Sequence, residues 1–174
     1  TDDILDPVWV NSRGAIPRFD RGSIEIRIMD VQECPSADLA IQALVIETIR
    51  ALTQEKFSPL EDQMQLRTDS LATLLDDVAR SGSEVRFMDA EYPAVFGLPA
   101  GTTTGEAWAH IYAQLAPHSQ ELQGWDRTIQ QLLNHGPLAK RILKALAGDY
   151  RHDSLSKVYR NLADCLVNDR MFSV

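Results

Sequence analysis

Glutamate and arginine alternate with isoleucine in the segment SIEIRIMD, residues 23–30. An extended strand points successive side chains to opposite faces, so Glu25 and Arg27 share one face and the isoleucines share the other. If the isoleucine face packs under helices, the polar face looks into water or a cleft. A carboxylate suits a hard cation such as Mg²⁺, and an arginine one pleat away can bind a phosphate or carboxylate held by that metal.

The same alternation is also typical of an ordinary amphipathic strand. In that interpretation Glu25 and Arg27 face solvent and interact with charges on a neighbouring strand. Period-two patterns are common in antiparallel sheets, so the alternation by itself favours the ordinary strand. A choice between the two interpretations requires the surrounding sequence.

The segment RFDRGSIEIRIMDVQECPSADLAIQALVIETIRAL resembles the C-terminal signature of the glutamate-cysteine ligase family of the bacterial carboxylate-amine ligase type. In that signature an arginine-rich turn leads into a strand of the form T-[IL]-E-[IVF]-R-[IV]-x-D and then into a long apolar helix. The segment is more distantly similar to the I-E-x-R segment of glutamine synthetases, which share the fold of that superfamily. The resemblance is sharp over residues 9–52 and weaker through the middle, and GPLAKRILKAL and NLADCLVNDRMF resemble the family's tail.

This resemblance implies roles for four residues. Glu25 matches the strand glutamate that binds Mg²⁺ in the ATP site, and Arg27 matches the arginine that contacts the terminal phosphate and the acyl-phosphate formed from it. Arg18 matches an arginine that contacts a substrate carboxylate or phosphate, and Arg13 matches the one four or five residues before it. Arg27 and Arg18 are thus the expected catalytic residues, with Arg13 helping to bind the nucleotide. The implied cofactors are ATP and Mg²⁺, and the implied substrates are a glutamate-like acid and an amine or amino acid.

The turn before the strand departs from the family pattern D-x-R-P-S-x-R-F-G-T. Asn11 stands where the family has an acid, Gly14 and Ala15 stand where it has proline and serine, and Asp20 and Arg21 resemble an insertion. These departures leave the acid and the amine open. They also keep a second hypothesis open, namely a non-catalytic helical interaction or regulatory module on a ligase-derived scaffold.

Patterns along the chain predict an α+β fold, with a few antiparallel strands at the N-terminal end and a mostly helical subdomain after them. Strands are predicted at residues 6–10 and 23–30, joined by a loop, and the resemblance places them in a glutamine synthetase-like sheet. The whole chain would be the C-terminal part of a ligase catalytic domain. Residues 1–35 would carry the strands and the active-site turn, and residues 36–174 the helices, with an irregular insert near 83–105.

Apolar residues at helical spacing predict several helices in the second region. The first follows an N-cap at Ser36, the second runs from Leu60 to Arg80, a later one is capped by Thr104, and the last is capped at position 153 or 154. The positions expected to be buried are Leu39, Ile41, Leu44, Val45, Ile49, Leu52, Leu71, Leu74, Leu75, Val78, Trp108, Ile111, Tyr112, Leu115, Leu122, Trp125, Ile129, Leu132, Leu133, Leu155, Val158, Tyr159, Leu162, Cys165 and Leu166.

Composition excludes several classes of protein. Seventeen Lys and Arg against 25 Asp and Glu give a net charge of −8, so attraction to nucleic acid or to an anionic membrane is not expected. No apolar run approaches the roughly 20 residues that cross a bilayer. Cys34 and Cys165 lack metal-ligand spacing. We therefore expect a cytoplasmic protein with both thiols reduced.

The start of the chain predicts a fragment. Strand-like sequence begins within a few residues of Thr1, and the glycine-valine-glutamate strand found near the N-terminus of such ligases has no counterpart. The expected partner is therefore a missing N-terminal portion of the same protein, and the fragment alone is expected to be inactive. An incomplete sheet exposes an unpaired edge, so self-association into a homo-oligomer is also expected.

Overall fold

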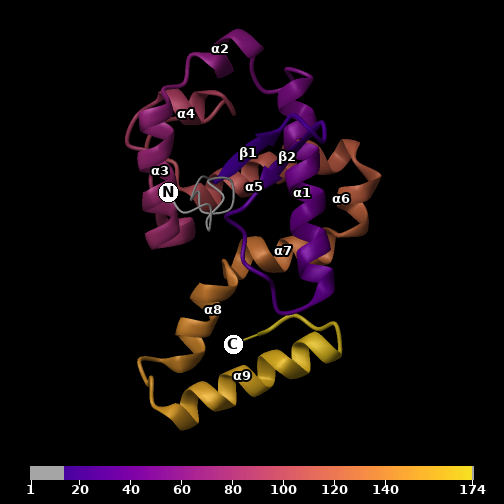
Figure 1. The fold of residues 1–174 in the computed structure, drawn as a ribbon, viewed down its shortest axis with the longest axis vertical. Coiled ribbons are helices and arrows are strands. Elements are labelled where there is room, and N and C mark those ends of the chain that lie inside the picture. Colours follow the sequence, from indigo (N-terminus) through magenta and orange to yellow (C-terminus); the bar gives the residue numbers. More distant parts are fainter. Residues whose placement is uncertain (1–13, 174) are drawn as a thin grey trace, which may run out of the picture. The chain divides into compact units, whose positions relative to one another are not determined.

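The computed structural model describes residues 14–173, which form two compact units. Residues 14–31 contain a β-hairpin, and residues 32–173 are helical (Figure 1). The fold is therefore α+β, with antiparallel strands at the N-terminal end followed by helices, as the sequence predicted. Among the described residues, no helix has both the length and the apolar character needed to span a membrane.

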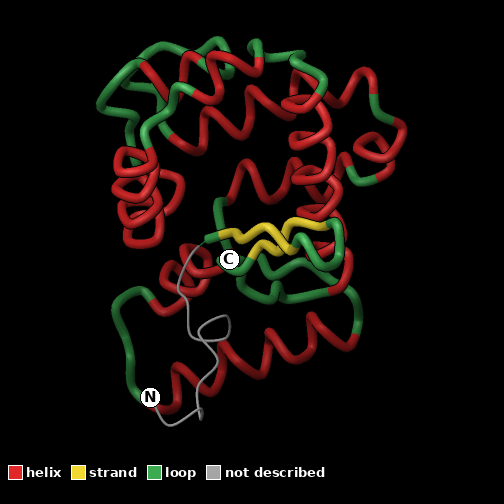
Figure 2. The backbone as a smooth tube through the Cα atoms, turned by 45° about the horizontal axis from the view of Figure 1, so that its top comes forward, coloured by secondary structure: helices red, strands yellow, loops and turns green. Residues whose placement is uncertain are grey.

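The hairpin pairs β1 (Ala15–Arg18) with β2 (Ser23–Ile26) in antiparallel register. The two strands are the yellow segments of Figure 2. Ile16 lies opposite Glu25, so these two residues share a face of the ladder. Gly22 has a φ of +58° in the connecting turn, a backbone conformation that glycine adopts without the steric cost of a Cβ atom.

The predicted strand boundaries were partly wrong. β1 lies inside the segment predicted as a loop, and β2 ends at Ile26 instead of continuing to Asp30. The proline in AIPR masked the first strand, because proline cannot donate to a ladder and is usually confined to edge strands. The predicted strand at residues 6–10 lies outside the described residues.

The isoleucine face of β2 is not the buried surface that the alternation suggested. Ile24 and Ile26 keep 60% and 37% of their surface exposed. The alternation was right about which side chains share a face, but it could not show that another layer covers that face.

Helices make up most of the second unit. In chain order they are α1 (Pro35–Thr53), α2 (Leu60–Met64), α3 (Thr68–Ser81), α4 (Glu91–Ala94), α5 (Thr104–Leu115), α6 (Gln120–Gly124), α7 (Asp126–His135), α8 (Leu138–Leu146) and α9 (His152–Val167). The helix predicted over 60–80 is two helices, because the backbone of Arg67 leaves the helical region with ψ 128°. The predicted end at Arg80 is correct to within one residue, because α3 ends at Ser81 and Gly82 follows with a φ of +56°.

The main core lies where α1, α5, α6 and α7 meet. Helix α1 presents a stripe of alanines to it, and Ala37 and Ala40 are completely buried. By contrast Leu39 is 47% exposed, so its predicted burial was wrong. α1 is apolar over most of its circumference, and hydrophobicity alone did not show which side faces the core. Small side chains on the buried side allow neighbouring helices to approach closely.

Some of the other positions predicted to lie in the core are buried, and others are exposed. Ile111, Leu122 and Ile129 are buried as expected, at 4%, 0% and 1% exposure. Trp108 and Tyr159 are 39% and 59% exposed, so these two predictions were wrong. Tyr159 lies at the edge of its apolar stripe, where the pattern does not separate buried from exposed side chains. Trp108 lies within its stripe, and the local pattern does not explain its exposure.

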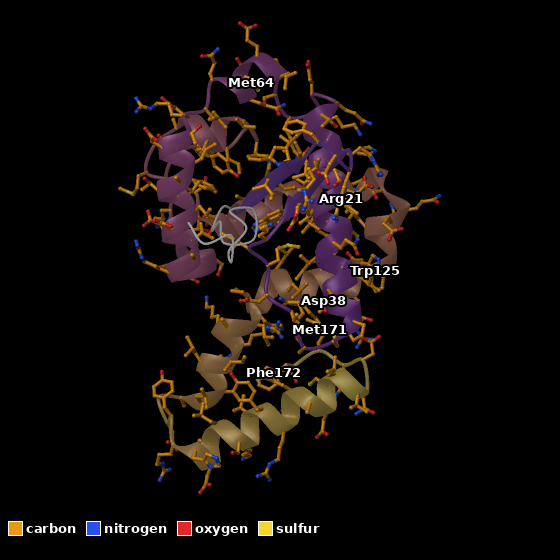
Figure 3. The ribbon with its side chains drawn as sticks, viewed as in Figure 1. Arg21, Asp38, Met64, Trp125, Met171 and Phe172 are labelled. Carbon is orange, nitrogen blue, oxygen red and sulfur yellow. The ribbon has the colours of Figure 1, made fainter. Side chains whose placement is uncertain are left out.

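A second, smaller core joins α8 and α9 to the segment that follows them. Leu146, Val158, Cys165 and Phe172 are its buried members. Phe172, in the segment after α9, is labelled in Figure 3. The predicted burial of Cys165 on the apolar face of the last helix is confirmed, and Cys34 is also buried and free.

Two helix N-termini are capped differently from the prediction. Helix α5 has a capping box in which Thr103 Oγ1 accepts from the Glu106 amide at 3.1 Å and Glu106 Oε2 accepts from the Thr103 amide at 2.7 Å, so the cap is Thr103, not Thr104. At α1 the predicted cap Ser36 is itself capped: Asp169 accepts from its amide at 2.9 Å and from its hydroxyl at 2.6 Å.

A buried ion pair fixes the chain just before α1. Glu33 and Arg141 form a salt bridge in which the side chains are 0% and 4% exposed. Arg141 Nη1 also donates to the Phe172 carbonyl at 2.9 Å, and the Phe172 amide donates to Glu33 Oε1 at 3.0 Å. Arg141 Nε donates to the carbonyl of Gly136 at 3.2 Å. The buried charges are therefore paired and hydrogen-bonded, as burial requires.

Candidate functional site

The polar face of the hairpin brings three of the predicted site residues together. Arg18 Nη1 lies 2.9 Å from Glu25 Oε2, and Arg27 Nε lies 2.9 Å from Glu25 Oε1. We call these three residues the hairpin triad. The prediction that Glu25 and Arg27 share a face is confirmed by their contact.

The register of the hairpin explains how Arg18 reaches Glu25. Arg18 lies directly opposite Ser23, two residues before Glu25 on the partner strand. Diagonal neighbours on one face of an antiparallel pair are within reach of long side chains. Arg27 lies just beyond β2, where its amide still donates to the Gly14 carbonyl at 2.9 Å. The carboxylate thus receives one guanidinium from each side of the turn.

The two residues of the apparent insertion extend this network. Asp20 accepts from Arg18 Nε and Nη2, both at 3.3 Å, and Arg21 Nε lies 3.5 Å from Asp20 Oδ2. Three arginines and two carboxylates leave a formal excess of one positive charge. Sequence reasoning missed the role of Asp20. Its position two residues after Arg18 was the available signal, but the pairing depends on the turn that folds Asp20 back.

The ion pairs keep the site fully charged near neutral pH. The hydrogen bond from Arg18 is the main cause of a lowered pKa at both Glu25 and Asp20. Hydrogen bonds to Asp20, and then to Glu25, raise the pKa of Arg18. Glu25 is therefore a carboxylate, able to accept but not to donate, throughout the physiological range.

Exposure differs between the members of the triad. The side chains of Arg18 and Arg27 are 22% and 20% exposed, whereas that of Glu25 is 37% exposed. Both guanidinium groups are therefore held by contacts before any ligand arrives, and the carboxylate between them still meets solvent. Guanidinium groups in fixed positions suit the bidentate recognition of phosphate or carboxylate.

The residue types of the triad are those that bind an oxyanion through arginines and a hard cation through a carboxylate. A carboxylate offers about four lone-pair sites, and the two arginines use one oxygen each. Glu25 therefore keeps acceptor capacity for a cation. Mg²⁺ is commonly held by one or two carboxylates together with substrate phosphates and water. Within residues 14–173 no group of three or more His, Cys, Asp or Glu side chains could hold a metal ion, so Glu25 would supply one ligand among several.

The fourth predicted residue, Arg13, lies outside the described residues. Its predicted contact with the nucleotide therefore stays a prediction.

Comparisons with known proteins identify one relative and no family. No family model matches the chain, and no solved structure matches it. A stretch of 81 residues, 47% of the chain, is 41% identical to a protein of Archaeoglobus fulgidus that is described only as uncharacterized. The chain spans about a fifth of that relative, 20% of its length. The similarity carries no activity with it, so the ligase resemblance stays a prediction.

Proposed function

We propose that this chain contributes phosphate-binding arginines and a metal-binding carboxylate to an ATP-dependent carboxylate-amine ligase of the glutamate-cysteine type. The observation that supports this most directly is the position of Glu25, held between Arg18 and Arg27 on one face of the hairpin. That arrangement matches the residue types and spacing that the strand signature of the family requires.

Each member of the triad has a role that follows from its charge. In the proposed reaction the substrate carboxylate would take the terminal phosphoryl group of ATP and release ADP. An amine would then attack the acyl-phosphate, forming an amide and releasing phosphate and a proton. Arg27 neutralises negative charge on the phosphoryl oxygens. Arg18 orients the substrate acid through its guanidinium fork. Glu25 would supply one carboxylate ligand to the metal, and its contacts with Arg18 and Arg27 keep both arginines in place before substrates bind.

Preorganisation is the physical advantage of this arrangement. An arginine that is free in solution loses rotamer freedom when it binds an anion. Here Glu25 already restrains both guanidinium groups, so less of that entropy is lost during binding. A ligand phosphate can then accept hydrogen bonds from the guanidinium N–H groups that do not contact Glu25.

The test uses the natural gene product that contains these 174 residues. ADP release is measured with MgATP, glutamate and a panel of amines. We expect Arg27→Gln and Glu25→Gln to lower kcat by about a hundredfold or more, the usual effect of removing a group that stabilises developing charge. The matched control is Arg21→Gln in the same hairpin, because Arg21 is 69% exposed and pairs with Asp20 instead of Glu25.

Two results would overturn the proposal. One is the absence of ADP release with every acid and amine pair. The other is a Glu25→Gln variant that behaves like Arg21→Gln, with the same kcat and the same dependence on Mg²⁺ concentration. A higher Mg²⁺ requirement for Glu25→Gln than for Arg27→Gln would support the assignment of Glu25 as the metal ligand.

One observation favours the second candidate, a non-catalytic interaction or regulatory module. Both oxygens of Glu25 are neutralised by arginines, which is also what a purely structural ion pair requires. For such a module, MgATP would not bind, and Glu25→Gln would change only the stability of the hairpin. Calorimetric titration of the gene product with MgATP separates the two candidates before any substrate is known.

A further inference from the structure

A cavity of about 210 Å³ lies where the C-terminal end of α1 meets the end of α5. Its apolar wall comes from Ala51, Phe57 and Leu115. Ala51 and Leu115 are buried at 1% and 7% exposure, and Phe57 packs edge-on against Phe96 with ring centroids 5.4 Å apart. The wall is therefore part of the main core, so it is held in place by packing.

The rim of this cavity is polar, and Lys56 is its cation that is not paired with a carboxylate within residues 14–173. Arg50, Lys56, His118 and the amide of Gln114 line it, and Glu47 is its acidic member. Glu47 forms an ion pair with Arg50, which compensates both charges. Across the part of the chain that the structure describes, the side chains of Lys56, Gln114 and His118 have no hydrogen-bond or ion-pair partner.

Helix capping does not account for these side chains. Cations near a helix C-terminus often bind its last carbonyl groups. Here the carbonyl oxygens of Arg50, Ala51 and Leu52 accept from the backbone amides of residues 54–56, at distances of 2.9–3.0 Å. Backbone amides therefore already donate to these carbonyl oxygens at the end of α1. The side-chain donors of Lys56 and Gln114 stay available to a ligand.

We propose that this cavity binds a small organic anion, meaning a carboxylate or phosphate attached to a small apolar body. A cavity of about 150 Å³ can hold benzene, so 210 Å³ is large enough for a ring together with one anionic group. Phe57 and Leu115 would cover the apolar body, while Lys56 and Gln114 donate to the anion. The lining combines three apolar residues with five polar or charged ones, which suits a ligand that has both an apolar body and an anionic group. This inference is independent of the proposed ligase activity and of the hairpin.

Four probes test the proposal by calorimetry or ligand-observed NMR on the natural gene product. Benzoate and phenyl phosphate each combine a ring with an anion, benzyl alcohol keeps the ring without the charge, and inorganic phosphate keeps the charge without the ring. We expect at least one of the first two to bind about tenfold or more tightly than either of the others. Comparison of benzoate with phenyl phosphate then distinguishes a carboxylate site from a phosphate site.

Variants identify the site of binding. Lys56→Gln removes a charged donor from the rim and should weaken binding of the organic anion by about tenfold, as expected for one charge-assisted hydrogen bond. Lys157→Gln, in an exposed lysine of α9, is the matched control and should leave binding unchanged. Both side chains are exposed, so neither change should unfold the protein. The proposal would be overturned if neither benzoate nor phenyl phosphate bound more tightly than benzyl alcohol, or if the two variants bound the organic anion with equal affinity.

Discussion

Removal of the Arg141 guanidinium should be among the most destabilising single changes in the helical unit. Arg141→Ala leaves the Glu33 carboxylate buried at 0% side-chain exposure without its charged partner and removes a donor from the Phe172 carbonyl. Breaking a buried ion pair by removing one partner costs about 3–5 kcal/mol. For a protein of this size each kcal/mol lowers Tm by about 2–4 °C, so the expected decrease is on the order of 10 °C.

Urea denaturation followed by tryptophan fluorescence measures this loss, because Trp108 and Trp125 both lie in the helical unit. The matched control is Lys140→Ala, at the neighbouring position on α8. Lys140 pairs with Glu84 at the surface, where the two side chains are 52% and 67% exposed. Exposed pairs contribute about 0–1 kcal/mol, so this variant should remain close to the wild type.

Replacing both Glu33 and Arg141 distinguishes the cost of an unpaired buried charge from the cost of lost side-chain packing. Glu33→Leu combined with Arg141→Met leaves no unpaired buried charge, and such replacements are often neutral or stabilising. We expect the double variant to recover most of the stability that Arg141→Ala loses. The reasoning would be refuted if Arg141→Ala cost no more than Lys140→Ala, or if the double variant were the less stable of the two Arg141 variants.

The same pair predicts a dependence on acidity. Burial by itself would raise the pKa of Glu33, but hydrogen bonds from Arg141 and from the Phe172 amide outweigh it and lower the pKa below its ordinary value of 4.5. A lowered pKa in the folded state means stabilisation that is present above about pH 4.5 and lost as the pH falls further. Unfolding measured from pH 7 to pH 3 should show this loss in the wild type and a smaller one in Arg141→Ala.

Three further changes test individual contacts, each by the free energy of unfolding in urea. Thr103→Ala removes the capping box of α5 and should cost about 1 kcal/mol. Asp169→Ala removes both acceptors from Ser36 and should cost about 1–3 kcal/mol, whereas a loss within error would mean that this cap is dispensable. Tyr112→Phe removes a 2.5 Å hydrogen bond to Asp126. Burial, and then Asp126, raise the pKa of Tyr112 to about 12, so the stability of the wild type should decline as the pH rises from 10 towards 12. The Tyr112→Phe variant should lack that decline.

Local periodicity predicted the parts of the candidate site that depend on neighbouring residues. The shared face of Glu25 and Arg27 follows from the two-residue repeat of a strand, and the structure confirms it. The contact of Arg18 with Glu25 depends on the register of the hairpin, which the sequence did not define because the first strand was placed too early. Asp20 completes the network only because the turn brings it back to Arg18.

In the helical unit, too, the sequence predicted contacts between residues that are close in the chain and missed contacts between residues that are far apart in it. The capping box at Thr103 lies within four residues, so the sequence located it to within one position. Asp169 caps Ser36 from 133 residues away, and no local pattern contains that contact. Arg141 resembled an ordinary surface cation of an amphipathic helix, yet it is buried because its partner Glu33 lies 108 residues earlier in the chain.

The contact between Glu33 and Phe172 has a consequence for biosynthesis. These residues are 139 positions apart, and the amide of Phe172 is one of the donors that satisfy the Glu33 carboxylate. A growing chain on the ribosome has made Glu33 long before Phe172 emerges, so the carboxylate stays hydrated until Phe172 has been synthesised. Closure of so large a loop is entropically costly and slow. The start of α1 is therefore synthesised well before the partner that completes its native surroundings.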